Sequence, residues 1–167
     1  MTHDAALAEQ LDAIAYPGHI AALGCTLIDW TVHGPAYART MVETAQVLAR
    51  ELAALGLPVH AIERGGTRSH QLALQARSLG GGQAAAPRLG AAGLLCCGIG
   101  LPIAEVEGDL SGLRLGTPEI VRLGLTPADM PRLAELIARG LPDADPVALR
   151  AEVAAWRRTL GALRYVL

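Results

Sequence analysis

Apolar residues in the first third of the chain recur at helical spacing. The pattern predicts a helix over residues 4–15 and a second over 20–32, which is apolar nearly all round. The sequences YPGH and HGP are expected to break the chain before and after this second helix. A third helix is predicted over 36–55, ending before Gly56.

The rest of the chain mixes short apolar runs with helical patterns. Strands are predicted at 57–62, 70–76, 92–100 and 112–116, and helices at 83–92, after Thr117–Pro118, after the cap signature Thr126–Asp129, and at 145–160. This order indicates a small mixed α/β domain behind a helical N-terminal arm. The arm has no sheet of its own to cover, which indicates a missing partner.

Composition narrows the class of protein. A chain of 167 residues with 51% hydrophobic and 18% charged residues predicts about one globular domain. The net charge of −2 predicts no nucleic-acid partner and no attraction to an anionic membrane. The sequence offers no apolar run that could span a bilayer and no basic region of a secretory signal, so a cytoplasmic location is expected.

Cysteine and histidine spacing predicts neither a disulfide framework nor a metal site. Cys25, Cys96 and Cys97 lack the CxxC spacing of zinc sites and are expected to be reduced thiols. The basic residues are more informative, because all 14 are arginine and none is lysine. The chain therefore has no amine side chain with which to form a Schiff base to a carbonyl cofactor.

Four motifs, in order, resemble one enzyme family. LDAIAYPG, GGTRSHQLAL, AAGLLCCGIGLP and SGLRLGTPEIVRLGLTPADMPRLAELIARGL are similar to the C-terminal part of serine hydroxymethyltransferase. The resemblance implies an α/β fold class, with the α+β small domain of a fold-type-I pyridoxal-phosphate (PLP) enzyme preceded by a helical arm. Residues 1–34 would then correspond to the end of the large cofactor domain, and 35–167 to the small domain.

The resemblance assigns roles to a few residues. Arg114 matches the arginine that binds the carboxylate of the substrate amino acid, and a planar guanidinium suits that task. The alternative is a structural arginine paired with Asp109 or Glu119. Gly18 and His19 match a loop that reaches the phosphate of pyridoxal 5′-phosphate. Cys97 replaces an asparagine that touches folate, so we expect no tetrahydrofolate site of the usual kind.

The family's cofactor lysine lies before the matched region, which predicts a second component. The chain is either a fragment or the small subunit of a split enzyme, and its start at Met1 favours the split enzyme. We expect a lysine-bearing partner that corresponds to the N-terminal half, a heterotetramer, and an amino-acid substrate for hydroxymethyl transfer or aldol chemistry. The alternative is a non-catalytic regulatory or binding subunit with the same fold.

Overall fold

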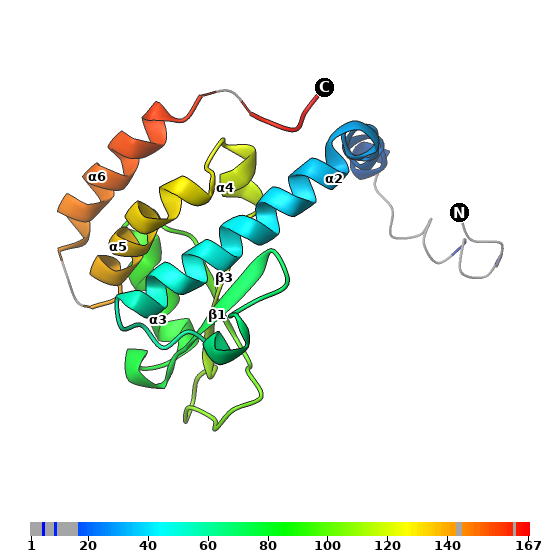
Figure 1. Cartoon of the computed structure of the whole chain (residues 1–167). Helices are drawn as coiled ribbons and strands as arrows, with labels where there is room; N and C mark the ends of the chain where they lie inside the picture. Colours follow the sequence, from blue (N-terminus) through cyan, green and yellow to red (C-terminus); the bar gives the residue numbers. More distant parts are fainter. Residues whose placement is uncertain (1–4, 6–8, 10–16, 143–144, 162) are drawn as a thin grey trace. The chain divides into compact units, whose positions relative to one another are not determined.

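The computed structural model describes residues 5, 9, 17–142, 145–161 and 163–167 (Figure 1). The helices are α2 (Pro17–Ala54), α3 (Gly82–Ala91), α4 (Pro118–Arg122), α5 (Met130–Gly140) and α6 (Pro146–Thr159). The strands are β1 (Gln71–Gln75), β2 (Cys97–Ile99) and β3 (Gly112–Gly116), and short 3-10 turns cover Ile62–Arg64, Arg77–Leu79 and Pro127–Asp129. None of these helices combines the length and apolar character needed to cross a membrane.

Helix α2 corrects one prediction from the sequence. A break was expected at residues 33–35, but α2 continues through Pro35 to Ala54. A proline inside a helix removes one hydrogen bond. Starting a new helix requires an unfavourable nucleus, so continuation across a single lost bond is favoured. The Pro-Gly turn expected at residues 16–19 is also wrong from Pro17 onward, because Pro17, Gly18 and His19 are helical. The helix predicted over 4–15 lies mostly outside the described residues.

Internal contacts divide the chain into two units. The first contains the described residues up to Pro35, together with Tyr165–Leu167, and the second contains Ala36–Arg164. Within the first unit, the backbone N–H of Leu167 donates to Asp29 Oδ1 at 3.1 Å. The functional division expected between residues 34 and 35 stays a prediction.

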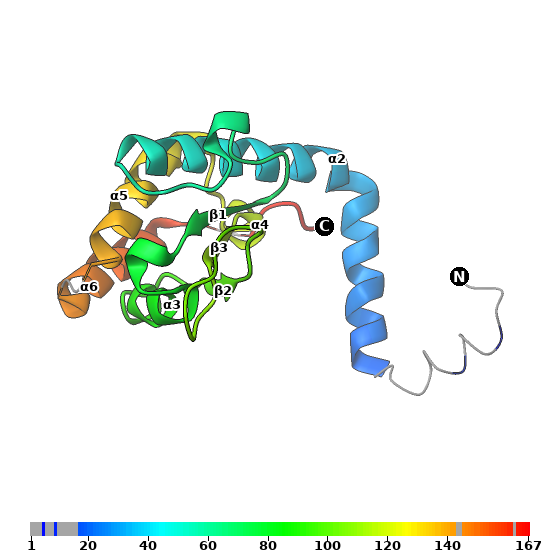
Figure 2. The same ribbon diagram turned by 90° about the horizontal axis from the view of Figure 1, so that it is seen from below.

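The second unit is built on a three-stranded antiparallel sheet with the order β1-β3-β2. Leu72 and Leu74 of β1 and Leu113 and Leu115 of β3 are buried on one face, as period-two alternation requires. The core on this face is completed by residues of three helices: Ala45, Leu48, Ala49 and Leu52 of α2, Ala85 and Leu89 of α3, and Met130, Leu133, Ala134 and Ile137 of α5. Helix α3 lies beside β2 and β3 (Figure 2).

Local signals predicted most element ends in this unit. After α2, Leu57 N–H donates to Leu52 C=O, and Gly56, at φ +79°, donates to Ala53 C=O, so the expected glycine ends the helix. The strand predicted at 57–62 is wrong, because only Val59 pairs, in an isolated bridge with Leu74.

Candidate functional site

Arg114 lies in the central strand, on the face opposite the core. Its neighbours Leu113 and Leu115 are buried, whereas Arg114 is exposed. In the antiparallel register Arg114 pairs with Ala73 of β1 and Cys97 of β2, and directly paired residues project to the same face. The sheet thus presents the guanidinium between two small side chains.

Arg114 also lines an open hollow of about 420 Å³. The residues around it come from all three strands, the segment before β2 and the start of α4: Gln71, Leu95, Cys96, Cys97, Arg114, Gly116, Pro118 and Glu119. Gly116 contributes no side chain to the hollow. The space beside it is open, because a Cβ added there would meet nothing nearer than Pro118 Cδ at 3.7 Å. The side chain of Leu95 is 88% exposed, so this part of the surface is apolar as well as cationic.

The structure gives Arg114 no ion pair with either acidic residue considered from the sequence. Asp109 instead accepts hydrogen bonds from the backbone N–H groups of Gln83 at 2.8 Å and Ala84 at 3.0 Å, at the start of α3, and from its neighbour Leu110. The Gln83 N–H group chiefly holds the pKa of Asp109 below its usual value. A contribution from burial opposes this shift, and the other two N–H groups add to it. Within the described residues, the guanidinium of Arg114 is therefore available to a ligand.

The two adjacent cysteines have different surroundings. Cys97 is paired with Arg114 on the open face. Cys96 packs against the core, where burial, followed by the nearby Cys97, raises the pKa of its thiol to about 11. A thiol with such a pKa stays protonated near neutral pH and is a poor nucleophile. Both cysteines line the hollow, but only Cys97 is paired with Arg114 across the strands.

The other predicted site residues, Gly18 and His19, lie in the first unit. Both are exposed at the described start of α2, and a Cβ at Gly18 would meet nothing within 4 Å. Arg114 belongs to the second unit, so a site shared by these residues and Arg114 stays a prediction. Among the described residues, no cluster of three or more histidine, cysteine, aspartate or glutamate side chains could hold a metal ion.

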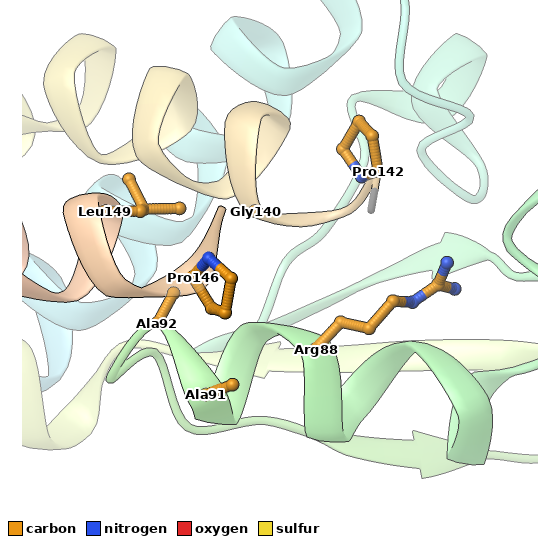
Figure 3. A pocket seen from close by; sticks show the side chains of 7 residues that line it. All are labelled: Arg88, Ala91, Ala92, Gly140, Pro142, Pro146 and Leu149. Carbon is orange, nitrogen blue, oxygen red and sulfur yellow. The ribbon is translucent and has the colours of Figure 1, made fainter. Parts of the chain in front are cut away.

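A second hollow, of about 250 Å³, lies where α3 meets the end of α5 and the start of α6 (Figure 3). Its lining is apolar apart from Arg88: Arg88, Ala91, Ala92, Gly140, Pro142, Pro146 and Leu149. The Arg88 side chain points away from Leu149, and its Nη2 donates to the carbonyl of Leu79. Among the described residues of its lining there is no acid, base or nucleophile, so these residues offer a cation beside apolar surface.

Sequence reasoning missed two residues of the Arg114 hollow. Gln71 lies opposite Gly116 in the register, and Leu95 lies two residues before Cys97. The alternation of β1 carries a signal for Gln71, because it separates Gln71 from the buried Leu72 and Leu74. Its position beside Arg114 depends on the strand pairing, which the sequence does not specify.

Comparison with solved structures defines the class of fold. The chain matches L-threonine transaldolase from Pseudomonas fluorescens, a fold-type-I PLP enzyme, with a TM-score of 0.73 and 25% sequence identity. The match covers 85% of this chain and 32% of the transaldolase. The expected fold, a helical segment followed by an α+β unit of such an enzyme, is confirmed.

Sequence comparison then identifies the particular relatives. The chain is 58% identical to an alpha-methylserine aldolase from Variovorax paradoxus over 99% of its own length and 39% of that protein's. It is 38% identical to the serine hydroxymethyltransferase of Methanopyrus kandleri over 95% of its own length and 40% of that enzyme's. No family model matches the chain. The chain is thus a homologue of these enzymes, spans about two fifths of their length, and confirms the resemblance seen in its motifs.

Proposed function

We propose that this chain supplies the substrate-carboxylate site of a PLP-dependent aldolase or hydroxymethyltransferase that acts at the Cα of an amino acid. The observation that carries the proposal is Arg114, an exposed guanidinium in a hollow of a sheet whose other face is the core. The 58% identity to an alpha-methylserine aldolase favours aldol cleavage or formation of an α-methyl-β-hydroxy amino acid.

The role of Arg114 follows from its chemistry. A guanidinium makes two parallel charge-assisted hydrogen bonds to a carboxylate and keeps its charge at any physiological pH. Holding the carboxylate at two points fixes the rotation of the substrate, and so determines which bond at Cα is presented for cleavage. When bound, PLP supplies the electron sink for that cleavage.

The residues of this chain suit a non-covalent contact to the phosphate of the cofactor, but they cannot attach the cofactor covalently. Gly18 and His19 lie at the described start of α2, where backbone N–H groups of a helix suit a phosphate, and no Cβ at Gly18 obstructs the approach. The chain contains no lysine. We therefore propose that a lysine-bearing partner, corresponding to the remaining length of the relatives, holds most of the cofactor.

The first part of α2 supports such a partner. Its apolar side chains are between 41% and 58% exposed over two sides of the helix: Ile20, Leu23, Leu27, Ile28, Trp30 and Val32. A contiguous apolar surface of this kind is usually covered by protein. We propose a heterotetramer of two small and two large chains, and gel filtration of the mixture against each chain alone measures its mass.

The residue at the position of the family's folate-contacting asparagine supports a folate-independent reaction. Cys97 occupies the cross-strand position, and a thiol is a weak donor and a weak acceptor. The proposal predicts that adding tetrahydrofolate leaves the rate of aldol cleavage by the assembled enzyme unchanged. A rate that rises with tetrahydrofolate would assign the chain to a folate-dependent transferase instead.

The decisive test substitutes Arg114 in the assembled enzyme. Losing two charge-assisted hydrogen bonds, at about 1.5–3 kcal/mol each, should raise KM about 100-fold or more in Arg114→Gln. Arg114→Lys keeps the charge but loses the planar pair of parallel N–H donors, so a KM increase of about tenfold is expected. Arg150→Gln is the matched control, because Arg150 is an exposed arginine of α6, away from the sheet.

The outcome also separates the two classes of function. If the complex keeps its full turnover and KM with Arg114→Gln, the chain is a regulatory or binding subunit and not part of the substrate site.

The visible spectrum gives an independent test of the partner. The absorbance of lysine-bound PLP should appear only when the chain is mixed with the lysine-bearing product of a neighbouring gene, and its appearance in the chain alone would refute the split site.

A further inference from the structure

Besides Arg114 and Glu119, the hollow is lined by a neutral polar side chain, that of Gln71. Gln71 lies directly opposite Gly116 in the β1–β3 register, and Arg114 is two residues further along β3 on the same face. Diagonal neighbours of this kind are about 7–8 Å apart at the backbone. Because Gly116 has no side chain, nothing from β3 separates the carboxamide from the guanidinium.

Hydrogen bonds orient the carboxamide of Gln71. Its nitrogen, Nε2, lies 3.2 Å from Nε2 of His70. An amide nitrogen only donates, so in this contact the ring nitrogen of His70 is the acceptor. The backbone of His70 is fixed in turn, because its carbonyl accepts from the N–H of Thr117 at 3.0 Å.

This arrangement leaves the Oε1 atom of Gln71 as an acceptor with no donor among the described residues. Besides the carboxylate of Glu119, which also lines it, the hollow therefore offers a guanidinium for a carboxylate and a neutral carboxamide oxygen for a hydroxyl. A small molecule that carries both groups a few atoms apart matches the pair better than a plain carboxylate.

The other end of the same strand provides an internal comparison. Gln75 also lies on the Arg114 face of β1 and also opposes a glycine, Gly112. There, however, a Cβ on Gly112 would lie 2.6 Å from the side chain of Leu101, so the space above this glycine is already filled. Only the glycine opposite Gln71 leaves an open hollow.

We infer that Gln71 determines specificity by accepting a hydrogen bond from the hydroxyl of a β-hydroxy-α-amino acid whose carboxylate is bound by Arg114. The inference rests on the proposed function, since it needs the carboxylate at Arg114. A site that pairs with a substrate hydroxyl discriminates against the analogue without it, because the acceptor is then left unpaired.

The test measures amino-acid binding to the assembled PLP-containing enzyme by visible-spectrum titration. The ligand pairs are serine with alanine, and α-methylserine with 2-aminoisobutyrate, which differ only in the hydroxyl. Gln71→Met keeps the side-chain length and removes the acceptor. It should weaken binding of the hydroxylated member about three- to tenfold, and leave the other member within twofold. Gln71→Leu provides a second variant if the first does not assemble.

Two controls make failure of the inference distinguishable from failure of the proposed function. Gln75→Met should leave all four dissociation constants unchanged, whereas Arg114→Gln should weaken both members of each pair. Suppose that Arg114→Gln weakens binding of both members of each pair as expected. If Gln71→Met then weakens binding of both members equally, or of neither member, the role of Gln71 is refuted and the carboxylate site stands. If Arg114→Gln changes nothing, the proposed function falls, and the inference falls with it.

Discussion

Gly82 is the position where a single added methyl group should damage the sheet that carries Arg114. A Cβ built on Gly82, the first residue of α3, would lie 2.0 Å from the carbonyl oxygen of Gly112 and 3.0 Å from the Cα of Gly98. Both neighbours are strand backbone, so they cannot turn aside as the end of a side chain can. The alanine variant must move α3 away from β2 and β3.

The size of this movement gives the expected magnitude. To reach an ordinary separation of 3.4 Å, the contact with the Gly112 oxygen must open by 1.4 Å, the difference between 3.4 and 2.0 Å. Overpacking of a core by side chains costs about 1–3 kcal/mol. Because the clash here is with backbone, we expect Gly82→Ala to lower the free energy of unfolding by about 3 kcal/mol or more, a large part of the stability of a domain.

Urea unfolding of the chain, followed by far-UV circular dichroism, measures the effect. Gly90→Ala is the matched control in the same helix, because a Cβ there would meet nothing within 4 Å. That variant should be neutral or up to about 1 kcal/mol more stable, since alanine favours a helix over glycine. A Gly82→Ala variant within about 0.5 kcal/mol of the parent, or equal losses in both variants, would refute the close approach of α3 to the sheet.

Three further predictions test other contacts. Asp109→Asn should make the free energy of unfolding fall less steeply as the pH is lowered. The pKa of Asp109 in the folded state is lowered from 3.8, so its carboxylate stabilises the fold above that pH, and this contribution is lost as the pH falls through the lower value. Urea midpoints between pH 7 and 3 would measure the difference between the variant and the parent. Iodoacetamide at pH 8 should label exposed Cys25 well before Cys96, whose thiol has a pKa of about 11, as peptide mass spectrometry would show. Thr117→Val should cost about 1–3 kcal/mol in urea unfolding, because the fully buried hydroxyl donates to the carbonyl of Met41 in α2 at 2.8 Å, with the carbonyl oxygen of His70 also within 3.1 Å.

The sequence predicted elements well where a local signal acts alone. The strand predicted at 112–116 is present as β3, with the same bounds. The signature Thr126–Asp129 predicted a helix start, and both hydrogen bonds of the capping box are present. Such signals depend on atoms within a few residues of one another, so the sequence carries them completely.

Local rules failed where neighbours distant in sequence decide the outcome. The apolar run 57–62 has strand character, but only Val59 pairs with β1, and the chain then turns at Ala61, with φ +55°. At Pro35 a rule for helix ends predicted a stop, yet α2 continues. A strand forms only where a neighbouring strand pairs with it along its length. A proline need not end a helix when the residues before and after it are both helical.

For the candidate site, the sequence alone determined the residue type and the family resemblance: a guanidinium in a strand, within motifs similar to a carboxylate-binding enzyme, in a chain without lysine. Only the tertiary structure decided what surrounds that guanidinium. Strand pairing sets Cys97 opposite Arg114 and places Gln71 across the open space at Gly116. Register is fixed by the burial of alternate leucines against three helices, a property of the whole packed core that no short stretch of sequence contains.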